Sequence, residues 1–65
     1  MTSHERLILM ANQIAANLMH EPDPVSATVT HIRLFWDPRM KSLISGHREG
    51  LTETAAAAIA ALADG

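Results

Sequence analysis

The three prolines of this 65-residue chain limit how long its helices can be. Pro22 and Pro24 stand in the stretch HEPDP, and Pro38 stands in FWDPRM, which also holds the only Phe and the only Trp. Proline lacks an amide hydrogen, and in a helix its ring clashes with the carbonyl group four residues earlier. The residue before a proline is also disfavoured in the helical region. The sequence therefore predicts short elements with proline-containing junctions.

Between these junctions, apolar residues recur at the spacing of amphipathic helices. The stretch VSATVTHI, at 25–32, is also compatible with a short strand, but a single strand would have no pairing partner. We expect one small domain over residues 1–65. It should be an all-α bundle of three to four short helices, at about residues 3–19, 24–36, 38–49 and 53–63.

The first three expected helices each follow a residue that can cap them. Thr2 and Glu5 have the spacing of a capping box, in which each side chain accepts a hydrogen bond from the backbone amide of the other residue. Asp23 and Asp37 each precede a proline. An Asp cap followed by proline at the first helical position favours the start of a helix.

Glycine and alanine decide how the second half of the chain is organised. Gly50 is a natural stop for the helix at 38–49. Gly46 costs roughly 1 kcal/mol relative to Ala inside a helix, so it marks a close approach or an earlier end. Thr52 is expected to cap the alanine-rich helix at 53–63, which is too short to be stable alone in water. That helix could dock on the body of the protein, dock on a partner or stay frayed.

The expected helices carry apolar residues on more than one face. The inward face at 3–19 holds Leu7, Met10, Ala11, Ile14 and Leu18. The inward face at 24–36 holds Val25, Val29, Ile32 and Trp36, and that at 38–49 holds Met40, Leu43, Ile44 and His47. Leu9 and Leu34 point away from these faces. A domain this small buries only about 60% of its unfolded surface. Without cysteine it has no disulfides, so a partner or a second copy is the expected stabiliser.

Charge and hydropathy argue against two classes of partner. The formal net charge is −2 and the basic residues are scattered, whereas nucleic-acid-binding modules usually show a basic patch. The longest run without a polar residue, 55–63, is far shorter than the ~18 residues that suggest a membrane span. Asn12 and Gln13 interrupt the apolar N-terminal stretch, which argues against a signal peptide. We expect a cytoplasmic protein that binds neither nucleic acid nor membrane.

No pattern of residues indicates catalysis. The four histidines, at 4, 20, 31 and 47, include no pair three or four residues apart, so a metal site would need long-range convergence. Ser45 and His47 are two residues apart and do not face each other on a helix. A chain of this size also has little room for a closed pocket of ~300 Å³ or more. We therefore expect no catalytic residue, no cofactor-binding residue and no metal ligand.

The junction around FWDPRM instead suggests a surface for binding another protein, because aromatic residues, Met and Arg are enriched at interface cores. The predicted partner-binding residues are Leu9, Asn12, Gln13, Leu34, Phe35, Trp36, Asp37, Pro38, Arg39 and Met40. Several have an ordinary alternative. The two aromatic residues could lie in the core, the two amides on a solvated face, and Arg39 could be solvated or paired with Asp37.

Two blocks of the sequence resemble one known family. MANQIAANL at 10–18 and HIRLFWDPRMKSLI at 31–44 are similar to the delta subunit of the cytoplasmic, NAD-dependent, molybdenum-containing formate dehydrogenases. The matching positions are 10–15 and 35–40, and the resemblance carries no catalytic role to any of them. We call MANQIAANL at 10–18 the first motif block and HIRLFWDPRMKSLI at 31–44 the second motif block.

The resemblance implies a cofactor-free accessory subunit that supports assembly or stability of an enzyme complex. In that family the alpha subunit carries the molybdenum bis(pterin guanine dinucleotide) centre and iron–sulfur clusters, and the beta and gamma subunits carry FMN, the NAD site and further clusters. The implied partner is the large alpha subunit, with contacts to the other subunits left open. Two alternatives remain from the residues alone: a small homodimeric helical scaffold and a nucleic-acid-binding regulator.

Overall fold

Local capping chemistry sets where the helices begin. In the computed structural model, which describes residues 2–46 and 49–64, helix α1 (Ser3–Asn17) starts with the predicted capping box of Thr2 and Glu5. Asp23 accepts a hydrogen bond from the Ser26 amide (3.1 Å) at the start of α2 (Pro24–Phe35). Both starts agree with the sequence-based prediction, because a cap depends on residues three positions apart.

The same chemistry repeats in the second half of the chain. Asp37 accepts from the Met40 amide (2.8 Å) at the start of α3 (Pro38–Ser45). Thr52 accepts from the Ala55 amide (3.4 Å) at the start of α4 (Glu53–Asp64). Among the described residues, 77% are helical and none lies in a strand, so the all-α prediction is confirmed.

The ends of the helices differ from the prediction by one to four residues. Helix α1 ends at Asn17 rather than at 19, because Leu18 leaves the helical conformation and the chain tightens into a turn before the prolines. Helix α2 ends at Phe35 because Trp36 takes an extended backbone (ψ 138°) ahead of the Asp-Pro junction. Helix α3 ends at Ser45 with Gly46 as its C-cap, the earlier of the two ends that the glycines allowed. The prediction that His47 faces inward lies outside the described residues.

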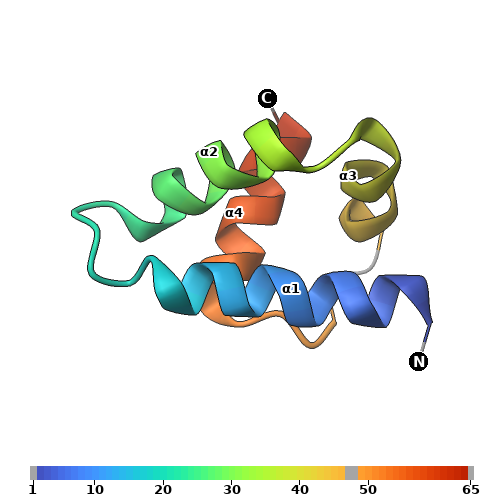
Figure 1. The fold of residues 1–65 in the computed structure, drawn as a ribbon, viewed down its shortest axis with the longest axis horizontal. Coiled ribbons are helices and arrows are strands. Elements are labelled where there is room, and N and C mark those ends of the chain that lie inside the picture. Colours follow the sequence, from blue (N-terminus) through green and yellow to red (C-terminus); the bar gives the residue numbers. More distant parts are fainter. Residues whose placement is uncertain (1, 47–48, 65) are drawn as a thin grey trace.

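Helix α4 packs against each of the other three helices (Figure 1). Its alanines permit this close approach: Ala55, Ala58 and Ile59 are completely buried. Helix α4 therefore docks on the body of the protein, which settles the three alternatives that the sequence left open. No helix in the described part of the chain is long and apolar enough to cross a membrane.

The core lies where the four helices meet. It is a buried cluster of Leu7, Ala11, Ala15, Ile32, Trp36, Ile44, Ala55 and Ile59. Thr28, which the sequence did not indicate as a core residue, is also completely buried. Its hydroxyl donates to the Pro24 carbonyl (2.7 Å) one turn earlier, so burial leaves no polar group unpaired.

Candidate functional site

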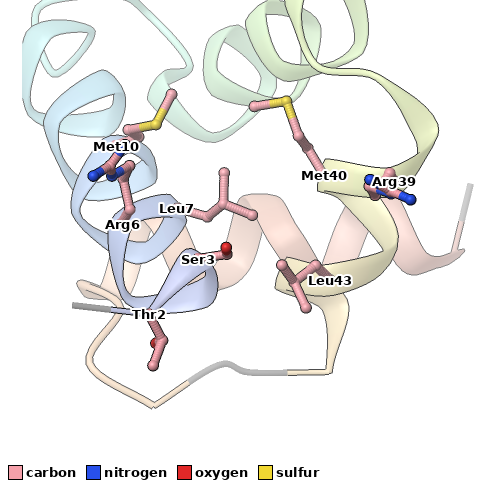
Figure 2. Close-up of a pocket in the computed structure, with 8 residues that line it drawn as sticks. All are labelled: Thr2, Ser3, Arg6, Leu7, Met10, Arg39, Met40 and Leu43. Carbon is pink, nitrogen blue, oxygen red and sulfur yellow. The ribbon is translucent and has the colours of Figure 1, made fainter.

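Helices α1 and α3 enclose an open hollow of about 450 Å³. Leu7 and Met40 point into the space between the two helices (Figure 2). The full lining is Thr2, Ser3, Arg6, Leu7 and Met10 from the start of the chain, and Arg39, Met40 and Leu43 from α3. Five of these eight residues are exposed and only Leu7 is buried, so the hollow is a surface groove and not a closed pocket.

A second hollow, of about 470 Å³, continues the first one toward the end of α2. The two share Met10 and Met40 and therefore adjoin, and we call the pair of hollows together the groove. The second hollow is lined by Met10, Gln13, Ile14, His31, Phe35, Trp36 and Met40. The groove thus unites the first motif block, on α1, with the second, on α2 and α3.

The two neighbouring aromatic residues have opposite surroundings. Trp36 is only 5% exposed and belongs to the core cluster, whereas Phe35 is 71% exposed. The Phe35 ring lies against the His31 ring, with centroids 4.7 Å apart and planes tilted by 42°. Phe35, and not Trp36, is therefore the aromatic side chain that the groove presents to solvent.

Half of the predicted partner-binding residues lie together in the groove. Gln13, Phe35, Trp36, Arg39 and Met40 all line it, although Trp36 does so as part of the buried core. Asp37 is the N-cap of α3 and Pro38 is its first residue, and the Asp37 carboxylate accepts a hydrogen bond from the Met40 amide.

Asn12, another of the predicted partner-binding residues, has a structural contact instead. Its side-chain amide donates to the Gly50 carbonyl (2.9 Å), and its side-chain oxygen accepts from the Thr52 amide (2.8 Å). Asn12 thereby holds the segment before α4 against α1. Leu9 lines a different hollow, next to Gly50, and Leu34 is exposed at 72% without lining any hollow described here.

The prediction missed three prominent lining residues: Arg6, Met10 and His31. Met10 was assigned to the core face of α1. It is 38% exposed, because it lies at the edge of that face, beside the groove. Sequence spacing could have identified the residues of α1 that line the groove, since Arg6, Met10 and Gln13 recur at helical intervals on one side of that helix. His31 and Phe35 are likewise one turn apart.

The charged residues that line the groove are basic. Arg6 and Arg39 line the first hollow, and no Asp or Glu lines either hollow. Arg39 does not form an ion pair with Asp37. The His20 ring lies 3.3 Å from the Glu21 carboxylate, a contact that is an ion pair only when the histidine is protonated. The described residues also contain no group of three His, Cys, Asp or Glu side chains that could hold a metal ion.

The carboxylate of Glu5, at the start of α1, has a perturbed pKa. The Thr2 hydroxyl donates to the Glu5 carboxylate (2.8 Å), and the Thr2 amide also donates to it (3.4 Å). These hydrogen bonds lower the pKa of Glu5, because they stabilise its charged form. This carboxylate serves the helix start and does not line the groove.

An open groove with methionine sulfurs, an exposed aromatic ring and arginines matches the composition of interface cores. Comparison with known proteins agrees: residues 6–62 match the family model described as "NADH-dependant formate dehydrogenase delta subunit FdsD". No curated protein and no solved structure matches the chain. The family match includes both motif blocks and most of the groove. The chain therefore belongs to the FdsD family, the delta subunits of NADH-dependent formate dehydrogenases.

Proposed function

We propose that this protein is a non-catalytic accessory subunit that docks through the groove on the large, molybdenum-containing subunit of a formate dehydrogenase. Docking would support assembly or stability of the complex in the cytoplasm. The observation that carries the proposal is the convergence of both motif blocks on one apolar groove. Those blocks are far apart in the sequence, and the fold brings them together at the surface.

The exposed apolar surface supports docking. Large hydrophobic side chains are normally covered, and patches of them mark interaction sites. Met10 and Phe35 line the groove and are among the exposed large hydrophobic residues of the described chain. The core is closed beneath them, since Trp36 and Ile32 are almost completely buried. Met10 and Phe35 are not members of the core cluster, so these two side chains are free to contact another subunit.

The absence of a catalytic role is inferred from the chemistry of the groove. Its lining combines thioethers, aliphatic side chains and two aromatic rings with two guanidinium groups. The other polar groups are two hydroxyls, one amide and one imidazole, from Thr2, Ser3, Gln13 and His31. Thr2 lines the first hollow and its hydroxyl contacts the His4 ring (3.3 Å), but that hydroxyl donates to the Glu5 carboxylate (2.8 Å) and serves the capping box at the start of α1. We therefore assign formate oxidation and electron transfer to the other subunits, as the family resemblance implies.

Phe35 and Leu34 provide a matched pair of variants for testing the docking site. The two residues are adjacent in α2 and equally exposed, at 71% and 72%, but only Phe35 lines the groove. Truncating an aromatic anchor at an interface costs about 2 kcal/mol or more, which corresponds to roughly 30-fold in Kd. Phe35→Ala should therefore weaken binding to the large subunit, and Leu34→Ala should not.

The assay is co-expression of the tagged chain with the formate dehydrogenase subunits, followed by measurement of the Kd for the large subunit. If Phe35→Ala retains full affinity while Leu34→Ala loses it, docking uses the opposite side of α2 and the groove is the wrong site. If both variants bind like the natural chain, docking through this end of α2 is refuted.

A further inference from the structure

The two hollows of the groove differ in charge. Arg6 and Arg39 line the first hollow and not the second, whereas His31 and Phe35 line the second and not the first. Met10 and Met40 belong to both. The groove therefore has a basic end near the start of α1, an aromatic end at the last turn of α2, and methionines between them.

The two arginines come from opposite sides of the first hollow. Arg6 belongs to α1 and Arg39 to α3, as Figure 2 shows. Both side chains are exposed, and neither forms an ion pair with a described residue of this chain. The chain as a whole is acidic, with a formal net charge of −2, whereas this end of the groove is lined by two cations and no carboxylate.

The acidic residues nearest to them in the sequence are already occupied. Glu5, next to Arg6, accepts hydrogen bonds from Thr2 in the capping box. Asp37, two residues before Arg39, accepts from the Met40 amide. These bonds hold each carboxylate at its helix start, and within the described residues neither carboxylate forms an ion pair with Arg6 or Arg39. The arginines therefore remain available to carboxylates from another molecule.

We propose that the segment of the large subunit seated in the groove is apolar and carries one or more carboxylates, which bind Arg6 and Arg39 at the basic end. This inference rests on the proposed docking function and adds the chemistry and the orientation of the occupant. The planar guanidinium group presents paired donors that match the geometry of a carboxylate. The acidic end of the segment lies over the start of α1, and its apolar side chains lie over Met10, Met40 and Phe35.

Charge complementarity favours this occupant over a second copy of the chain. Complementary charges set orientation and speed encounter, whereas like charges facing each other are costly. A symmetric pairing of two grooves offers the arginines no carboxylate, because no Asp or Glu lines either hollow. In an apolar segment with carboxylates at one end, the carboxylates would contact the basic end of the groove and the apolar side chains would contact the rest of it.

The test compares three single variants that each remove one positive charge: Arg6→Gln, Arg39→Gln and Arg33→Gln. Arg33 is an exposed residue in the last turn of α2 and lines neither hollow, so it is the matched control. The Kd of each variant for the large subunit is measured at low and at high salt. The double variant Arg6→Gln/Arg39→Gln should bind at least tenfold more weakly at low salt. The difference should shrink as salt screens the pairs.

Zero-length cross-linking identifies the carboxylates directly. A carbodiimide couples a lysine amine to a carboxylate in contact with it, so Arg39→Lys should yield a cross-link to an acidic residue of the large subunit, and Arg33→Lys should not. Circular dichroism of each variant checks that the fold is intact. No loss of stability is expected, because neither Arg6 nor Arg39 makes an ion pair within the described chain.

The outcomes separate this inference from the proposed function. If Phe35→Ala weakens binding while the Arg6 and Arg39 variants behave like Arg33→Gln, docking in the groove stands and the acidic occupant is refuted. If none of these variants weakens binding, both proposals fail. If the arginine variants change only the self-association of the free chain, measured by sedimentation, the occupant is a second copy and the inference is overturned.

Discussion

Replacing Trp36 with Ala should unfold the protein rather than disrupt only its docking. The side chain is 5% exposed and packs in the core cluster with residues of the other three helices. Truncating a buried aromatic side chain to Ala typically costs about 3–5 kcal/mol. A core in a domain below about 70 residues rarely supplies more than about 3–5 kcal/mol in total. Trp36→Ala is therefore expected to be largely unfolded at room temperature.

Phe35→Ala is the matched control for this prediction. Its side chain is mostly exposed, and the one ring contact it makes is with His31. Exposed substitutions of this kind usually change stability by no more than about 0.5 kcal/mol. Both variants remove an aromatic side chain, and the two residues are adjacent. A large difference between their free energies of unfolding therefore reflects how deeply each side chain is buried and not the loss of an aromatic ring as such.

Urea unfolding, followed by far-UV circular dichroism, measures the stability of both variants. The helical signal suits this comparison because it does not depend on the tryptophan that is removed. The natural chain and Phe35→Ala should show the same midpoint, and Trp36→Ala should lack a folded baseline. A Trp36→Ala chain that unfolds at the natural midpoint would refute the assignment of this residue to the core. The assignment also means that docking experiments should replace Phe35 and leave Trp36 intact.

Three further substitutions test other parts of the structure. Asn12→Ala removes both hydrogen bonds that hold the segment before α4, and it should lower the free energy of unfolding by about 1–2 kcal/mol in urea titrations. Gly50→Ala places a side chain where φ is +87°, a left-handed conformation that costs about 1–2 kcal/mol, and the melting temperature should fall accordingly. Glu5→Gln should reduce stability near neutral pH, because the lowered pKa of Glu5 in the folded state stabilises the fold above the unfolded-state pKa. That contribution is lost as pH falls through the folded-state pKa, so the two chains should become equally stable in acid.

The starts of the helices could be predicted from the sequence because capping is local. Thr2, Asp23, Asp37 and Thr52 each bond an amide three residues later, and that spacing can be read directly. The ends were less accurate. The turn after Asn17 depends on how the chain tightens before the prolines, and no single residue there marks it.

The candidate site could be predicted only in part. The second motif block indicated a docking surface, but a helical pattern alone could not decide which of its two aromatic residues is buried. Packing against the other helices decides it in favour of Trp36. The contact of Asn12 with Gly50 and Thr52 joins residues distant in sequence, and no local pattern signals such a contact.

Methionine oxidation provides the most direct test of docking through the groove. Met10 lines the groove, whereas Met19 lies near the other end of α1 and lines a different hollow with Asn12 and Thr54. Both are exposed in the free chain, at 38% and 57%, so each can react with peroxide. In the complex with the large subunit, Met10 should be oxidised several-fold more slowly than in the free chain, and Met19 should react at an unchanged rate. Protection of Met19 with no protection of Met10 would contradict the account.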